Sequence, residues 1–163
     1  MRTTDKRRER GTQIVELAVV LPLLLFLALA VSEGAGMIRA HQVLNNAARE
    51  AARLSTVQEN DGNIAFLQDT ATCYAVRNGI DLPAGQVPSW CPASPAPAQC
   101  VSYGVAVNQA LLVPDGSVLM PASQVTVTCA YRLHFLPRLP WFGVSGVIPL
   151  RVTAEFRNFW TDN

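Results

Sequence analysis

The fold of this chain depends on one apolar stretch near its start, Ile14-Val15-Glu16-Leu17-Ala18-Val19-Val20-Leu21-Pro22-Leu23-Leu24-Leu25-Phe26-Leu27-Ala28-Leu29-Ala30-Val31. Within these 18 residues, Glu16 carries the only charge. A helix of this length extends roughly 27 Å, close to the thickness of the hydrocarbon core of a bilayer. We therefore predict a membrane-spanning helix.

Basic residues precede this stretch. The segment 2–10 contains five basic and two acidic residues. Such a flank stays in the cytoplasm while the chain beyond the span is translocated. We therefore expect a basic cytoplasmic leader at 1–11, a transmembrane helix at 12–38 and an extracytoplasmic domain at 39–163. This topology predicts a single-pass protein of the cytoplasmic (inner) membrane.

Glu16 and Pro22 are unusual residues for a plain anchor. A carboxylate in an apolar span costs a few kcal/mol. Glu16 is therefore explained either by a cationic partner or by a shallow position from which it reaches the headgroups. Pro22 removes one backbone donor and clashes with the carbonyl of Ala18, which predicts a kink in the helix.

The helical pattern continues beyond the apolar stretch. Gly34 and Gly36 each weaken a helix by up to about 1 kcal/mol relative to Ala, which predicts a soft point there. Farther along, Glu50 and Arg53 are spaced to form an ion pair on the polar side. Small residues also recur every four positions, a spacing that lets membrane helices approach closely but that Ala-rich sequence produces by chance: Ala28, Ser32, Gly36 and Ala40.

Two motifs resemble a known family. Gly11, Glu16 as the fifth residue after it, and the unbroken apolar run resemble the class III signal of type IV prepilins. The run 16–25 and the octet 46–53, Asn46-Ala47-Ala48-Arg49-Glu50-Ala51-Ala52-Arg53, are more specifically similar to TadE-like minor pseudopilins of tight-adherence (Tad) pilus systems. The related TadG-like proteins remain an alternative assignment. The similarity covers about residues 11–55.

The resemblance implies a processing step and a structural role. In this family a prepilin peptidase cuts after the glycine, here between Gly11 and Thr12. The cleaved protein then helps other pilin-like subunits to assemble a pilus. The new α-amine of Thr12 would lie one helical turn from Glu16 and could pair with it on the same or a neighbouring subunit. The implied protein is a membrane-anchored minor pseudopilin, and it is extracellular if it enters the pilus.

The rest of the chain predicts an α+β fold, in which the long helix packs with a second helix and a small antiparallel sheet. The second helix is expected at about Ile64–Asn78, with Asp61-Gly62-Asn63 ending the linker and capping its N-terminus and Gly79 as its stop. Alternation of apolar and polar residues predicts strands at 102–107, 124–135 and 148–159. The loop at 136–144 contains Trp141 and Phe142, and either contacts a partner or membrane or folds over its own sheet.

All four cysteines lie beyond the anchor: Cys73, Cys91, Cys100 and Cys129. Outside the cytoplasm this number favours two disulfides, with three possible connectivities. Cys129 lies on the apolar face of its strand, where a buried partner fits. Cys91 and Cys100 bracket a short proline-rich segment. We therefore predict the pairs Cys73–Cys129 and Cys91–Cys100.

The sequence offers no set of residues for catalysis or nucleic-acid binding. Residues 12–163 carry a net charge of −2 and contain no basic patch. The segment 143–147 fails the nucleophile-elbow pattern at its last position, and there is no phosphate-binding glycine loop or metal-ligand cluster. His134 falls on the polar side of its strand and is expected to face solvent. We predict no enzymatic activity, cofactor, metal or small-molecule substrate.

Two other functions compete with the pilus role. Ordinary signal peptidase could cut after Ala28-Leu29-Ala30 and release a secreted, disulfide-bonded binding domain. Glu16 and the helical pattern beyond Val31 argue against this cleavage. An uncleaved anchor with an outer enzyme domain is disfavoured by the missing active site. The first residue of the mature protein separates the three: Thr12, Val31, or Met1 or Arg2.

Overall fold

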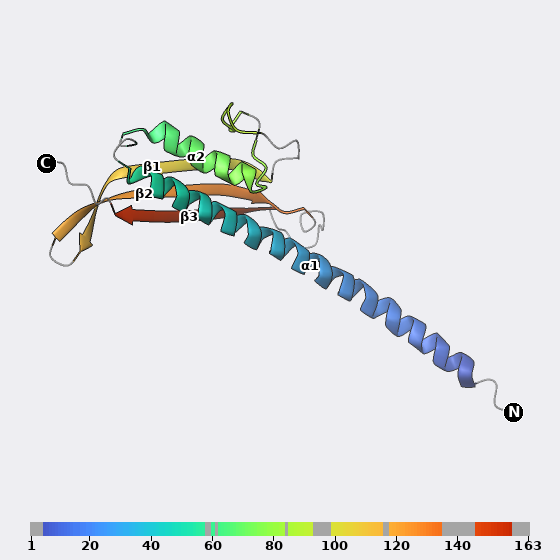
Figure 1. Ribbon diagram of the computed structural model, residues 1–163. Coiled ribbons are helices and arrows are strands. Elements are labelled where there is room, and N and C mark those ends of the chain that lie inside the picture. Colours follow the sequence, from blue (N-terminus) through green and yellow to red (C-terminus); the bar gives the residue numbers. More distant parts are fainter. Residues whose placement is uncertain are drawn as a thin grey trace.

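The computed structural model describes residues 5–57, 60, 62–83, 85–92, 99–115, 118–134 and 146–157. Its elements, in chain order, are α1 (Asp5–Ser55), α2 (Ile64–Arg77), β1 (Cys100–Asp115), β2 (Val118–Arg132) and β3 (Val147–Arg157). Figure 1 shows the sheet and α2 gathered at one end of α1, while the N-terminal part of α1 projects away from them. The predicted α+β class is confirmed.

Helix α1 is the longest element, with 51 residues and a length of roughly 77 Å. It continues without interruption through Pro22, Gly34 and Gly36, so the soft point predicted from the two glycines is not a break in the helix. A bend at Pro22 remains a prediction. The C-terminal half of α1 packs on the sheet and on α2 (Figure 1).

The three strands form an antiparallel sheet in the order β1-β2-β3. Val127 of β2 lies between Val105 of β1 and Val152 of β3. Strand β1 is longer than predicted and β2 begins earlier, whereas Phe135 and Phe159, the predicted ends of two strands, lie outside the described residues. The helix-facing side chains of β2 are buried because apolar residues occupy alternate positions: Val125, Val127, Cys129 and Tyr131.

The core lies between this face of the sheet and the two helices. Helix α1 contributes mainly alanines, whose small side chains let the helix backbone come close to the strands. Leu44 is the large residue among them and is fully buried. The buried residues of the α1 stripe are Ala40, Leu44, Ala47, Ala48, Ala51 and Ala52.

Helix α2 begins and ends as its local sequence predicts. The side chain of Asn63 accepts a hydrogen bond from the backbone N–H of Phe66 at 3.3 Å, which satisfies an otherwise unpaired helical donor. Gly79 follows the last turn with a φ of 87°, a conformation that favours glycine. Leu67, Ala71 and Ala75 are buried in the core, whereas Ile64 is exposed at the N-terminal end of the helix.

Both disulfides form, but the predicted pairing is wrong. The observed bonds are Cys73–Cys91, with Cα atoms 5.6 Å apart, and Cys100–Cys129, with Cα atoms 5.4 Å apart. The prediction placed Cys100 in a loop, yet β1 begins at this residue. An irregularity between Cys100 and Tyr103 then sets Cys100 beside Cys129 on the neighbouring strand.

The Cys73–Cys91 disulfide belongs to a separate, smaller cluster. Cys73 of α2 and Cys91 of the following loop pack with Val76, against Leu82 and Val87. This bond therefore holds the proline-rich loop against α2, whereas Cys100–Cys129 lies inside the main core.

The burial of Tyr103 in β1 leads us to predict how the free energy of unfolding depends on alkaline pH. Burial raises the pKa of Tyr103 to about 12, from 10.0 for an exposed tyrosine. Its contribution to stability is complete below pH 10 and is lost as the pH rises toward 12, because the unfolded chain releases the proton first. We expect the free energy of unfolding to fall by about 2 kcal/mol between pH 10 and about pH 11.5 through Tyr103.

This pH dependence can be measured by urea denaturation of the wild type and of Tyr103→Phe. The variant should lose less stability over the same pH interval. Equal losses in the two proteins would show that other groups cause the alkaline instability.

Candidate membrane anchor and assembly surface

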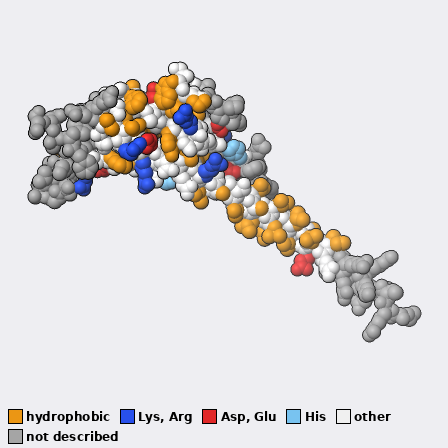
Figure 2. Space-filling view, viewed as in Figure 1, with side chains coloured by type: hydrophobic (Ala, Val, Ile, Leu, Met, Phe, Trp, Pro, Cys, Tyr) orange, Lys and Arg blue, Asp and Glu red, His pale blue; other side chains and the backbone are white. Residues whose placement is uncertain are grey.

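The N-terminal half of α1 exposes its apolar side chains. Within the described residues, Gln13–Ser55 is the one helix that is long and apolar enough to cross a membrane. Its most apolar window has a mean hydropathy of 2.8, and none of that window is buried against the rest of the chain. Figure 2 shows these side chains as a hydrophobic shaft that extends from the outer domain, the name used here for the folded part formed by the C-terminal half of α1, α2 and the sheet, without reference to a side of the membrane. This half of the helix is suited to contact lipid or other apolar helices rather than its own core.

Glu16 lies on this shaft and is exposed. No hydrogen-bond or ion-pair partner of its carboxylate is present among the described residues. Gly11 and Thr12 are helical in the backbone, and the side chain of Thr12 lies outside the described set. Thr12 therefore precedes Glu16 by about one turn of continuous helix, as the spacing predicts.

Glu33 marks the point where the shaft meets the outer domain. It is only 6% exposed, and its Oε1 accepts a hydrogen bond of 2.5 Å from the backbone N–H of His134. The Nδ1 atom of His134 lies 4.0 Å from the same oxygen. The backbone two residues past the end of β2 is thus tied to α1 just beyond the apolar shaft.

Sequence reasoning missed this contact, because the soft point predicted at Gly34 and Gly36 gave no reason to expect a buried contact at the neighbouring Glu33. The spacing of Glu33 from the buried residues of α1 could have indicated that its side chain is buried. Glu33 is four residues before Met37 and seven before Ala40, so it continues the buried stripe of α1 toward the membrane. An acidic residue on a buried stripe requires a donor, and the backbone of β2's end supplies it.

Gly36 allows close contact one turn later. A Cβ atom at this position would lie 3.0 Å from the hydroxyl oxygen of Tyr131, so a larger residue would displace this side chain. Gly36 and Ala40 therefore pack within the protein itself. Ala28 and Ser32, the other two residues of the small-residue spacing, remain exposed.

Two smaller predictions are confirmed. The guanidinium of Arg53 and the carboxylate of Glu50 form an exposed ion pair, with Nη2 and Oε1 2.9 Å apart. Exposed pairs of this kind contribute little to stability, because water and salt screen the two charges. The side chain of His134 is 51% exposed, as expected for the polar side of the sheet.

Other features bear less directly on function. In the described part of the chain, no group of three or more His, Cys, Asp or Glu side chains is placed to hold a metal ion. Trp141, Phe142 and Ser145 lie outside the described residues. The loop at 136–144, which contains Trp141 and Phe142, therefore keeps both predicted roles: contact with a partner or membrane, or folding over its own sheet.

Comparison with known proteins identifies one related family. Residues 11–53 match the profile of the family described as TadE-like protein. The match covers about a quarter of the chain and includes Gly11, Glu16 and Pro22, together with the octet 46–53. The resemblance inferred from the sequence is thus confirmed over these residues. No curated protein and no solved structure matches the chain.

Proposed function

We propose, from the match of residues 11–53 to TadE-like proteins, that this chain is a membrane-anchored minor pseudopilin of a Tad-type pilus. The family suggests a component associated with the Tad pilus. The finer role of minor pseudopilin is our proposal. It is structural: the chain occupies a place among pilin-like subunits and catalyses no reaction.

One observation carries the proposal. The same helix has two different surfaces along its length, and the family match includes parts of both. Residues 14–31 are exposed and apolar, whereas 40–52 carry a stripe that is buried under the sheet. A subunit of a helical bundle needs this division, since the free part packs against neighbouring helices while the other part holds a folded domain.

Processing after Gly11 would complete the assembly surface. A prepilin peptidase would remove the basic leader and leave the α-amine of Thr12 beside the membrane. Glu16 lies on the following turn, so this amine and the carboxylate could neutralise each other within or between subunits. Gly11 also helps the peptidase, because glycine lowers local helix stability by up to about 1 kcal/mol relative to Ala.

The proposed topology places the leader in the cytoplasm and the α+β domain outside the cytoplasmic membrane. The basic residues at 2–10 favour this orientation. Two disulfides in the outer domain also favour it, because disulfides persist outside the reducing cytoplasm. The proposed partners are the peptidase, the bilayer and other pilin-like subunits.

Cleavage by ordinary signal peptidase is the alternative. It would release the domain after Ala30. This bond lies in the middle of α1, which continues as a regular helix on both sides. The released chain would also lose the helix turns that precede the contact between Glu33 and His134. Both points favour cleavage at Gly11 instead.

Gly11→Leu tests the proposal. We expect the variant to accumulate as full-length precursor in the membrane, because a side chain at this position obstructs the peptidase cleft. Mass spectrometry of the mature protein should find Thr12 as the first residue in the wild type. Gly34→Leu is a matched control, since a Cβ atom at Gly34 meets no other atom within 4 Å. Normal processing of Gly11→Leu would contradict the prepilin assignment.

A further inference from the structure

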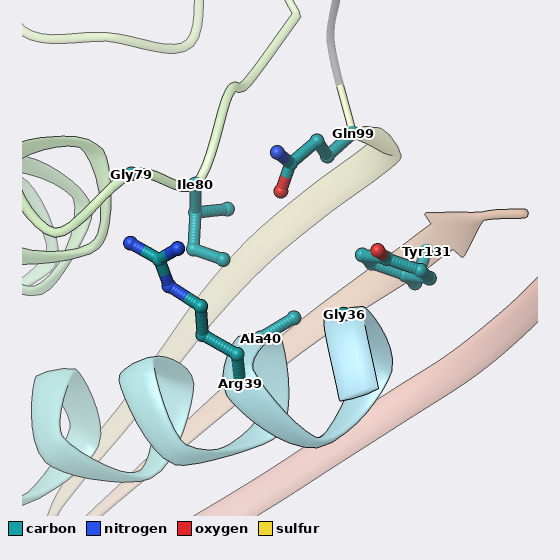
Figure 3. Close-up of a pocket in the computed structure, with 7 residues that line it drawn as sticks. All are labelled: Gly36, Arg39, Ala40, Gly79, Ile80, Gln99 and Tyr131. Carbon is teal, nitrogen blue, oxygen red and sulfur yellow. The ribbon is translucent and has the colours of Figure 1, made fainter. Parts of the chain in front are cut away.

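A small cavity lies where the outer domain meets α1 just beyond the apolar shaft. Its volume is about 120 Å³, roughly four times the volume that one water molecule occupies in the liquid. Figure 3 shows that α1 forms one side of it, at Gly36 and Arg39. The turn after α2 and the adjacent ends of β1 and β2 form the other sides.

Three hydrogen-bond donors border this cavity: the guanidinium of Arg39, the side-chain amide of Gln99 and the hydroxyl of Tyr131. Within the described part of the chain, none of these side-chain groups has a hydrogen-bond or ion-pair partner. Tyr131 is only 5% exposed as a whole residue, but its hydroxyl is not among the fully buried polar atoms that lack a partner, so water can reach it through the cavity when no ligand is bound. Burial, followed by the charge of Glu33, raises the pKa of Tyr131, so the hydroxyl remains a donor at neutral pH.

Two glycines keep the cavity open. A Cβ atom at Gly36 would come within 3.0 Å of the Tyr131 hydroxyl, and one at Gly79 would lie 3.6 Å from Nη2 of Arg39. Side chains at these two positions would fill the space between the donors. The three donors together suit a small anion with several acceptor oxygens.

The position along α1 indicates where this anion comes from. Gly36 and Arg39 follow Val31, the end of the apolar shaft, by roughly 8 and 12 Å of helix. The headgroup layer on each side of a bilayer is about 5–8 Å thick. When the shaft spans the membrane, Gly36 therefore lies at the outer edge of the headgroup layer and the backbone of Arg39 about 4 Å beyond it, so the cavity opens at the outer edge of the headgroups.

We propose that this cavity binds the phosphate group of a phospholipid of the adjacent leaflet. The lipid phosphate is a diester with a single negative charge. Glu33, whose charge acts on Tyr131, disfavours a more highly charged inorganic phosphate in the same place. The site fixes the height and rotation of the outer domain relative to the membrane surface. It rests on the anchoring of α1 in a bilayer and is independent of cleavage at Gly11.

Lipid titration of the full-length protein in a maltoside detergent tests this site. The probe is dihexanoyl-phosphatidylglycerol, and native mass spectrometry measures the fraction of protein that retains one lipid. Arg39→Gln should weaken retention roughly tenfold, because it removes a charged donor to the phosphate. Tyr131→Phe should weaken it several-fold. If Arg39→Gln loses the far-ultraviolet circular dichroism of the fold, lipid retention by Tyr131→Phe alone tests the site.

Matched controls separate this site from general attraction to charge. Arg49→Gln, ten residues farther along the same helix, and Tyr74→Phe on α2 should retain lipid as the wild type does. Dihexanoylglycerol, which lacks phosphate, should not bind. An equal loss in Arg49→Gln, equal retention in all variants, or equal binding of dihexanoylglycerol would overturn the proposal.

Competition identifies the chemical source of the anion. Dimethyl phosphate should displace the lipid at lower concentration than inorganic phosphate or acetate. Stronger competition by inorganic phosphate would make this a site for free phosphate, and stronger competition by acetate would make it a site for a partner's carboxylate. Either result overturns the lipid assignment. Carbonate extraction tests the anchor separately, because release from the membrane would contradict the proposed function rather than this site alone.

Discussion

Replacing both Cys100 and Cys129 with Ala should lower the free energy of unfolding of the outer domain by about 4 kcal/mol. The bond closes a loop with a sequence separation of 29, and its loss restores the corresponding freedom to the unfolded chain. Both residues are almost completely buried in the main core, so the smaller side chains also lose packing contacts. Urea denaturation of the full chain in detergent, followed by near-ultraviolet circular dichroism, measures this loss.

The pair Cys73→Ala and Cys91→Ala is the matched control. Its loop has a sequence separation of 18, and chain entropy alone predicts about 3 kcal/mol. The cysteines lie in the smaller cluster, so we expect less additional loss and little change in the core around Tyr131. A larger effect from this pair than from Cys100 and Cys129 would contradict the assigned places of the two bonds.

Peptide mapping of the non-reduced protein checks the pairing directly. Trypsin is unsuitable, because no Lys or Arg occurs between Arg77 and Arg132 and three of the cysteines would remain on one peptide. Chymotrypsin cleavage after Trp90 and Tyr103 yields the peptide 91–103, which contains both Cys91 and Cys100. The observed bonds join this peptide to the Cys73 peptide and to the Cys129 peptide, whereas a Cys91–Cys100 bond would leave it unlinked to either.

Glu16→Gln should abolish recovery of the pilin-like partner without preventing insertion or cleavage. In the proposed pair, the amine of Thr12 would lose its counter-ion in apolar surroundings, which costs several kcal/mol. We expect at least a roughly tenfold loss of partner in pull-downs from solubilised membranes. Glu16→Asp should be intermediate, since its shorter side chain keeps the charge but extends less far.

Glu50→Gln is the control for this measurement. Glu50 is on the same helix, outside the apolar shaft, and pairs with Arg53 on an exposed surface. Its substitution should leave partner recovery unchanged. If Glu16→Gln recovers as much partner as the wild type, Glu16 is a tolerated residue near the headgroups and not an assembly contact.

Local sequence signals predicted the elements well wherever neighbouring residues determine the structure. The alternation in β2 and the cap at Asn63 depend on positions close together in the chain, and both were correct. The alanine stripe of α1 was also predictable, because helical spacing alone places Ala40 and Ala47 on one side.

Features that depend on strand pairing were not predictable in the same way. The disulfide pairing follows from the register between β1 and β2, which the positions of the cysteines in the sequence do not reveal. The contact of Glu33 with His134 joins residues 101 positions apart. The donors around the cavity likewise come from α1, β2 and the residue before β1, so no short motif could have indicated them.

The continuity of α1 has a mechanical consequence. The helix runs without a break from the apolar shaft to the buried stripe at 40–52, and the hydrogen bond of Glu33 and the contact of Gly36 hold the junction between them. The outer domain is therefore rigidly coupled to the anchor in rotation. If a neighbouring helix contacts Glu16 from one side, that contact also determines the orientation of the sheet face that points away from the helices, tens of ångströms from Glu16. Contacts made inside the bilayer would in this way decide which surface of the outer domain is presented to its surroundings.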